Sequence, residues 1–185
     1  MDYSNLRNLR VWSNGGAGIA PFALVAPFSY FATNGIKSPQ APFAALGDQV
    51  KITTAHQFLE GKGWLYYILA PAKNKLDIDV VGDPGFVKQS QTANLYFPGN
   101  SPELHETYQA LLNVPCIVLV KDSNCAANLY MQLGCDCEGA YLGGPWNSGT
   151  SKDSAKGFSA TFTYDGPAMF YAPDPTSAIM ADVAS

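Results

Sequence analysis

The cysteines are the side chains in this sequence best suited to metal or redox chemistry. Cys135 and Cys137 flank Asp136, and with Cys125 upstream they offer three thiolates to a zinc ion. The spacing is not the usual Cys-x-x-Cys pair, and neither histidine lies nearby in the sequence. We therefore favour reduced cysteines that, like Cys116, serve as small apolar residues on strands. A chain of this length can build its core without disulfides, and no cofactor is expected.

The other polar candidates lack a spacing typical of catalysis. His56 falls in a predicted strand and His105 on a predicted helix, where most histidines have structural or surface roles. Asp77 and Asp79 lie two apart on one face of a predicted strand, which favours a solvated face over a carboxylate pair for glycoside hydrolysis. The sequence has no phosphate-binding loop, nucleophile elbow or His-Glu-x-x-His motif. We therefore expect that the protein is not an enzyme.

Composition favours a β-rich chain with little charge. Of 185 residues, 47% are hydrophobic and 14% are charged, and 17 glycines and 13 prolines indicate many turns. The net charge of −4 argues against a nucleic-acid clamp, although it suits a surface that DNA must pass without binding. The apolar stretch 19–32 contains Pro21 and Pro27, and no run reaches the roughly 20 residues that span a bilayer. Because the sequence begins at Met1, we expect synthesis in the cytoplasm without a cleaved signal, and no membrane partner.

Residues 1–48 are predicted to form an extended arm and loop region. The segment 14–18 is rich in glycine, and prolines punctuate the apolar stretch that follows. Pro21 and Pro27 are expected to exclude a long helix and any central strand through those points. The segment 23–31 can still supply a short edge strand.

Residues 49–172 are predicted to hold a β core with one packed helix. The helix spans 102–112, with Ser101 as its N-cap and an apolar stripe of Leu104, Tyr108, Leu111 and Leu112. Strands are predicted at 50–58, 64–69, 76–80, 87–97, 116–120, 128–133, 137–142, 158–164 and 168–172. The first four are expected to form a meander with hairpin-length connections. Residues 173–185 form a tail, and the whole chain, 1–185, is predicted to be a single domain.

The polar loop 143–157 is the strongest candidate for a contact between subunits. It is long for a hairpin connection, and Trp146 is its single large side chain among small ones. We expect Trp146, Ser148, Thr150 and Lys152 to contact a neighbouring subunit. In the alternative, Trp146 folds back onto the core of its own chain.

The order of elements in the second half resembles that of a known family. It includes Pro115-Cys-Ile-Val-Leu-Val-Lys-Asp122, Gln132-Leu-Gly134, Ser148-Gly-Thr150 and Lys156-Gly157. This order is similar to that of virion structural proteins of tailed bacteriophages, specifically tail-tube-like subunits. The resemblance covers about residues 49–172, as an order of elements and not as a diagnostic motif.

The resemblance implies a mainly β fold with one packed helix, a β-sandwich or barrel of the tail-tube type. It implies a homo-oligomer, with six subunits in a ring and rings stacked into a tube through which DNA passes without specific binding. Asp77 and Asp79 are then the acidic candidates for the lumen, other virion proteins are partners, and the protein is located in the virion after assembly in the host cytoplasm. A tail terminator, ring protein or capsid accessory is a related possibility.

Two readings from other classes remain open. A carbohydrate-binding or adhesin-like β-domain would use Trp64, Trp146 and surface tyrosines to stack on sugars. An enzyme whose site has no sequence signature ranks last.

Overall fold

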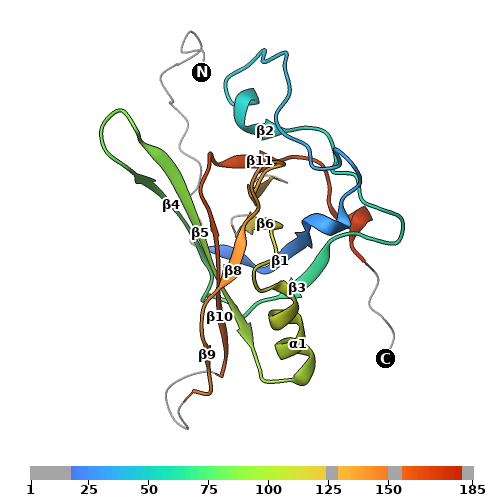
Figure 1. The fold of residues 1–185 in the computed structure, drawn as a ribbon, viewed down its shortest axis with the longest axis vertical. Coiled ribbons are helices and arrows are strands. Elements are labelled where there is room, and N and C mark those ends of the chain that lie inside the picture. Colours follow the sequence, from blue (N-terminus) through green and yellow to red (C-terminus); the bar gives the residue numbers. More distant parts are fainter. Residues whose placement is uncertain (1–17, 124–128, 150–155, 181–185) are drawn as a thin grey trace.

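The computed structural model describes residues 18–123, 129–149 and 156–180 (Figure 1). These residues form a mainly β structure with one α-helix, which confirms the predicted fold class at that level. The strands are β1 Ile19–Pro27, β2 Lys51–Ile52, β3 Leu65–Ile68, β4 Lys75–Val81, β5 Lys88–Pro98, β6 Cys116–Asp122, β7 Tyr130–Leu133, β8 Tyr141–Gly143, β9 Trp146–Asn147, β10 Gly157–Tyr164 and β11 Met169–Tyr171. The helix is α1 Pro102–Leu111, and short 3-10 helices lie at Phe28–Tyr30, Asp48–Val50 and Thr176–Ala178.

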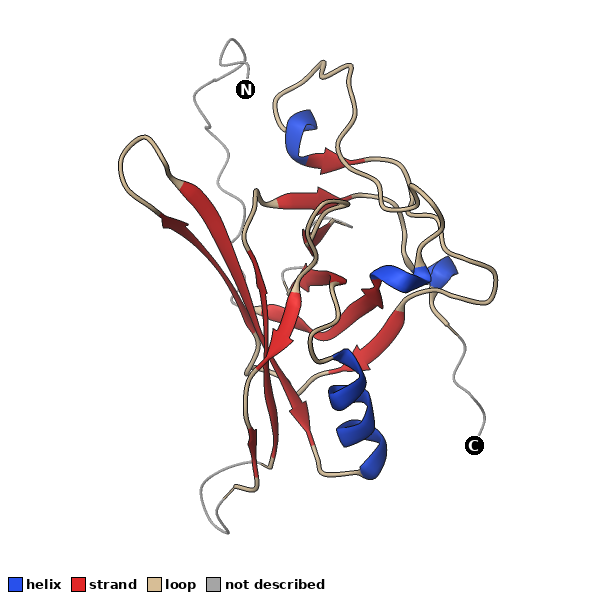
Figure 2. Cartoon of the chain, viewed as in Figure 1, coloured by secondary structure: helices blue, strands red, loops and turns tan. Residues whose placement is uncertain are grey.

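The strands form two open sheets (Figure 2). The six-stranded sheet has the order β2-β11-β7-β6-β1-β3, and all its pairs are antiparallel except β11 with β2. The five-stranded sheet is antiparallel in the order β4-β5-β10-β8, with β9 also paired to β10. The described residues form no closed barrel, so the prediction of a barrel is wrong for this part of the chain. The two open sheets are only loosely consistent with the predicted β-sandwich.

The first core lies between the two sheets. Alternate residues of β1 and β6 pack against alternate residues of β5 and β10, as period-2 alternation requires. From the six-stranded sheet come Ala23, Val25, Cys116, Val118 and Val120, and from the five-stranded sheet Ala93, Leu95, Phe158, Ala160 and Phe162.

A second core covers the opposite face of the six-stranded sheet. Leu24, Ile117 and Leu119 point to this side, and Trp64 and Tyr171 are its largest fully buried side chains. Loop segments between β1 and β3 form part of the cover, and Trp64 forms backbone hydrogen bonds with Ala178 and Met180 near the end of the described residues. β1 and β6 are therefore buried on both faces, which is why both are apolar without alternation.

β1 corrects the prediction that prolines exclude a central strand before residue 48. β1 lies between β6 and β3, and Ala23 and Val25 are fully buried, so residues 19–27 belong to the core and not to an arm or an edge. The pairing of β1 with β6 is interrupted between Ile19 and Ala23. Pro21 sits in that interruption, where a missing backbone N–H removes no ladder hydrogen bond.

The predicted meander over 49–97 is also wrong, apart from its last hairpin. β3 pairs with β1 in one sheet, whereas β4 and β5 pair with each other in the other sheet. The strand expected at 50–58 is reduced to β2 and an isolated bridge from Phe58 to Phe31. β6, β7, β10 and β11 lie within their predicted segments or within a residue or two of them.

Helix α1 forms as its sequence predicts. The Ser101 side chain accepts a hydrogen bond from the Leu104 backbone N–H at 3.2 Å, which confirms the N-cap. Leu111 is buried, and Leu104 and Tyr108 pack against the first core. Leu112 lies past the helix end with 39% of its surface exposed, so it does not belong to the buried stripe.

We expect Leu111→Ala to lower the free energy of unfolding by about 2 kcal/mol, because a buried leucine is replaced by a cavity at the edge of the core. Leu112→Ala is the matched control and should change it by less than about 0.5 kcal/mol, because Leu112 is exposed. Urea unfolding followed by tryptophan fluorescence measures both. Equal losses in the two variants would contradict the packing of α1 described above.

Candidate functional site

The outer face of the five-stranded sheet is lined with polar side chains. The strand registers place Asp77 opposite Thr92 and Asp79 opposite Ser90, so these carboxylates share that face. The sheet lies along the left side of the molecule in Figure 1, with the six-stranded sheet on its other face. The remaining outward residues on β5 and β10 are Asn94, Tyr96, Ser159, Thr161 and Thr163. Hydroxyl and amide groups therefore dominate the surface.

Most charges on this face are paired. Lys75 Nζ lies 2.6 Å from Asp77 Oδ2, and Lys73 Nζ lies 4.4 Å from the centre of the Tyr96 ring. The face is therefore close to neutral, and less acidic than the net charge of the whole chain suggests. The prediction that Asp77 and Asp79 face a lumen remains a prediction.

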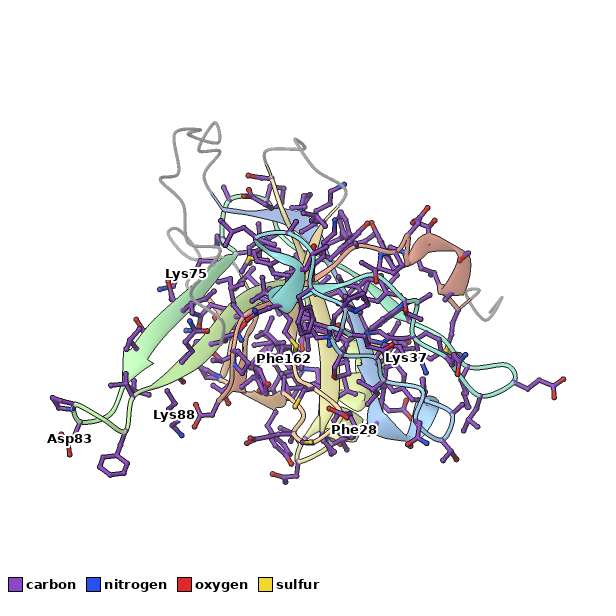
Figure 3. All side chains as sticks on the ribbon, turned by 90° about the horizontal axis from the view of Figure 1, so that it is seen from above. Phe28, Lys37, Lys75, Asp83, Lys88 and Phe162 are labelled. Carbon is purple, nitrogen blue, oxygen red and sulfur yellow. The ribbon has the colours of Figure 1, made fainter. Side chains whose placement is uncertain are left out.

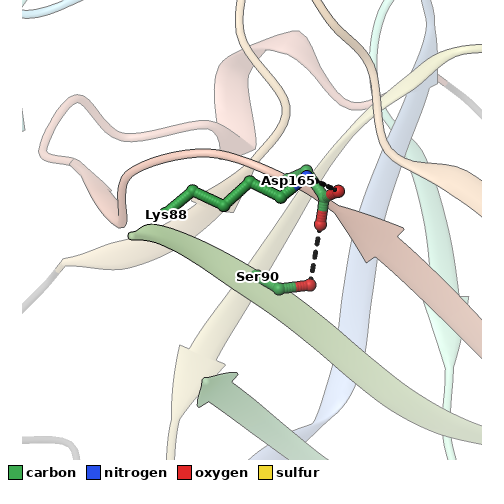
Figure 4. Close-up of polar contacts among 3 residues, drawn as sticks. All are labelled: Lys88, Ser90 and Asp165. Carbon is green, nitrogen blue, oxygen red and sulfur yellow. Dashed lines mark hydrogen bonds and ion pairs between the residues drawn. The ribbon is translucent and has the colours of Figure 1, made fainter. Parts of the chain in front are cut away.

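Asp165 anchors the end of β10 to β5 across the sheet (Figure 4). Its carboxylate accepts hydrogen bonds from Lys88 Nζ at 2.5 Å and from Ser90 Oγ at 2.7 Å. The bond from Lys88 and then the bond from Ser90 lower the pKa of Asp165, and the same carboxylate raises the pKa of Lys88. Lys88 pairs with Val81 beside the hairpin turn, so this contact ties the turn end of β5 to the residue after β10. Lys88 and Asp165 are exposed, so the contact contributes little to stability.

The β4–β5 hairpin carries the largest apolar exposure in the described residues. Leu76 packs against the first core, but Ile78 is 37% exposed and Val80 is 70% exposed. The exposure of this face of β4 therefore increases toward the hairpin turn. Phe86 at the tip is 86% exposed and Val87 is 52% exposed. Figure 3 shows the hairpin standing away from the body, with Asp83 at its tip.

The hairpin tip is held in a defined turn. The Phe86 backbone N–H donates to the Asp83 carbonyl at 2.9 Å, and Gly82 and Gly85 both have positive φ. A Cβ at Gly82 would lie 2.5 Å from the Phe86 carbonyl oxygen, so a larger residue does not fit there. A rigid turn that presents a phenyl ring to solvent is a typical anchor for a protein contact. The turn residues 82–85 can be predicted from the sequence, but the exposure of the Phe86 ring cannot, so the sequence alone does not reveal this surface.

A groove lies between β3 and α1. Figure 1 shows these two elements at the lower right, on the opposite side of the molecule from the turn of the β4–β5 hairpin. It has a volume of about 470 Å³. β3 is the last strand of its sheet, so one side of its backbone has no strand partner among the described residues. The lining side chains that matter most are Leu65 and Tyr67 from β3, Ala110 and Leu111 from α1, and Val114 after it.

The predicted contact loop is only partly described. Trp146 and Asn147 form β9 against β10, so the loop is shorter than predicted. The Trp146 ring lies 5.6 Å from the His105 ring and 6.4 Å from the Phe158 ring, yet 36% of its surface is exposed. Ser148 is exposed, and Thr150 and Lys152 lie outside the described residues. The role of this loop in contacts between subunits therefore stays a prediction.

Trp64 cannot stack on a sugar, because it is fully buried. It packs in the second core against Phe31, Phe58 and Tyr171. Its proposed part in a carbohydrate site is therefore wrong. Tyr66 on the six-stranded sheet, at 47% exposure, and Tyr141 and Trp146 on the five-stranded sheet remain as exposed aromatic groups of the predicted kind.

His56 lies in a loop and not on a strand, and its hydrogen bonds are satisfied within the second core. Nδ1 accepts from the Lys37 backbone N–H at 2.9 Å, and Nε2 lies 2.9 Å from Gln132 Oε1. The Gln132 amide nitrogen donates to the Gly134 carbonyl, so its oxygen is free to accept the Nε2 proton. Burial of the ring, helped by the nearby charge of Lys37, lowers the pKa of His56 to about 4, although the hydrogen bond to Gln132 acts in the opposite direction.

The cysteines do not all fit the predicted role. Cys116 is fully buried on β6, and burial raises its pKa to about 12, as for an inert core thiol. Cys135 is half-buried and Cys137 is exposed, and both lie in the turn after β7 and not on a strand. Cys135 nevertheless packs against both cores, so the small apolar role holds for it although it is off a strand. That role is wrong for the exposed Cys137, and Cys125 lies outside the described residues.

Comparison with known proteins identified no relative. No family model, no curated protein and no solved structure matches this chain. Among the described residues, no helix is both long and apolar enough to cross a membrane. Any functional conclusion therefore depends on the surfaces described above.

Proposed function

We propose that this chain is a structural subunit that assembles with copies of itself, as the resemblance to tail-tube-like virion proteins implies. The observation that carries the proposal is the β4–β5 hairpin. It exposes Ile78, Val80, Val81, Phe86 and Val87 to solvent. A monomer gains nothing from this arrangement, because exposed apolar surface on a protruding edge strand favours aggregation unless a partner covers it.

The partner we propose is the β3–α1 groove of a second copy. β4 ends the five-stranded sheet and β3 ends the six-stranded sheet, so each offers a strand edge to the other. If β4 of one copy adds to β3 of the next, the apolar side chains of the hairpin fill the groove beside Ala110 and Val114. The hairpin turn and the elements β3 and α1 lie on opposite sides of the molecule (Figure 1). Such a head-to-tail contact produces a closed ring or an open helical filament.

The outer face of the five-stranded sheet supports a channel-lining role in that assembly. Its small polar side chains leave few unpaired charges, and Lys75 is engaged by Asp77. A wall of this kind offers DNA phosphates no cluster of free ammonium groups to bind. A location in the virion, rings of six subunits and contacts with other virion proteins belong to the same proposal.

The test is the oligomeric state of the full chain. We expect size-exclusion chromatography with light scattering to show species larger than a monomer, and negative-stain microscopy to show rings or tubes. Assembly should increase with concentration, because it follows mass action. A protein that remains strictly monomeric up to about millimolar concentration would overturn the proposal, since even weak subunit contacts have dissociation constants below that value.

A further inference from the structure

Cys137 lies where packing does not explain it, two residues after the half-buried Cys135. The backbone of the turn after β7 is fixed by a hydrogen bond from the Cys135 N–H to the Glu138 carbonyl at 2.8 Å. Cys137 is exposed, so it contributes nothing to a core. The position of an exposed thiol two residues from a second thiol therefore needs another explanation.

The structure brings three donor atoms together in this turn. The sulfur atoms of Cys135 and Cys137 and a carboxylate oxygen of Asp136 all lie within 4.8 Å of one another. Ligand atoms around a tetrahedral zinc ion are roughly 3.4–3.8 Å apart, given Zn–S and Zn–O bonds of about 2.3 and 2.0 Å. Small side-chain rotations close that difference, because the three donors already lie within 4.8 Å of one another.

Neighbouring groups orient two of the three donors. The Glu138 backbone N–H donates to the Cys135 sulfur at 3.3 Å, and the Ser38 hydroxyl donates to Asp136 Oδ1 at 3.4 Å. Ser38 is distant in the sequence, so the tertiary fold brings this contact to the turn. Hydrogen bonds of this kind hold thiolate and carboxylate ligands in place around metal ions.

The carboxylate of Asp136 is available to a cation. Asp136 takes part in neither of the two ion pairs found in the described residues, Lys75–Asp77 and Lys88–Asp165. Its charge is therefore not already compensated by an ion pair there.

We propose that Cys135, Asp136 and Cys137 bind one thiophilic divalent cation of the zinc class. Two thiolates select zinc, cadmium or cobalt over magnesium or calcium, which prefer oxygen ligands alone. Three protein ligands leave a fourth position to water. Binding releases the two thiol protons to solvent, so the affinity rises with pH. This inference does not depend on the proposed assembly function.

The test is cobalt titration of the reduced, metal-free full chain carrying Cys125→Ser. We expect one equivalent of Co²⁺ to produce a thiolate-to-cobalt absorption band in the near ultraviolet, and Zn²⁺ to abolish that band by displacement. Cys137→Ser should weaken binding at least about 100-fold, and Asp136→Asn about 10-fold, by loss of a ligand. Cys116→Ala is the matched control and should bind as before, because Cys116 is buried on β6.

Three results would overturn the proposal: no thiolate-to-cobalt band at one equivalent, an unchanged affinity in Cys137→Ser, or the same loss in Cys116→Ala. Circular dichroism of each variant shows that a lost band does not come from unfolding. The same protein without reductant distinguishes a disulfide between the two thiols, which would abolish the cobalt band until reductant is added.

Discussion

Phe86→Lys is expected to weaken self-association at least about 100-fold without destabilising the subunit. Phe86 is 86% exposed, so the folded monomer loses almost no packing. In the proposed assembly, the ammonium group would have to leave water for a mostly apolar groove, in which Glu106 is the one charged lining residue. Moving a charge out of water into such a lining is costly, and the contact of the phenyl ring is lost as well, so the whole interface is affected. Sedimentation velocity over a range of concentrations measures the change.

Phe43→Lys is the matched control. Phe43 is also an exposed phenylalanine, at 40%, but it lies in the loop before β2, outside the hairpin and the groove. It should assemble like the unmodified protein. If Phe43→Lys and Phe86→Lys are equally impaired, general surface apolarity drives association and the hairpin has no special part.

Ala110→Glu supplies the complementary half of the same prediction. Ala110 is exposed on α1 in the groove, so glutamate blocks the groove and leaves the hairpin intact. A mixture of Phe86→Lys and Ala110→Glu then contains one intact hairpin and one intact groove, on different chains. We expect this mixture to form discrete one-to-one dimers, whereas each variant alone stays monomeric. A mixture that remains monomeric contradicts the head-to-tail contact.

The second large effect is a loss of stability as pH falls from about 6.5 to about 4. His56 has a folded-state pKa of about 4, whereas an unfolded histidine has a pKa of about 6.5. Between these values the unfolded chain binds a proton that the folded chain excludes, so stability is fully present above about 6.5 and decreases below it. The difference corresponds to about 3 kcal/mol at the acid end of the window. Urea unfolding at several pH values measures it.

His56→Gln should remove most of this pH dependence, and His105→Gln should retain it. His105 lies on α1 near Asn100, outside the second core, so it controls for the general effect of replacing a histidine. Both proteins are best compared in the Phe86→Lys background, where assembly does not complicate the unfolding equilibrium. If the free energy of unfolding falls with pH as steeply in His56→Gln as in the unmodified protein, His56 is not the group responsible.

Local signals in the sequence determined several elements of this fold. Ser101 and Pro102 define the start of α1, because a capping side chain and a proline at N1 act within one turn. The alternation in β10 and the apolar run of β6 give their burial directly, since each pattern reflects which faces of the strand contact a core. These signals depend on neighbours in the sequence, so they can be read without the tertiary structure.

The tertiary structure decided which strands pair and which surfaces are left open. Nothing in residues 19–27 shows that β6 will lie beside them, and the interruption that accommodates Pro21 arises only from that pairing. The alternation of Leu76, Ile78 and Val80 predicts one buried face, but the six-stranded sheet ends before it covers Val80. Exposure of the hairpin, burial of Trp64 and the approach of Ser38 to Asp136 all depend on contacts between distant segments. The sequence by itself therefore determined the elements, and long-range packing determined the candidate sites, because burial is a property of the assembled layers and not of any one strand.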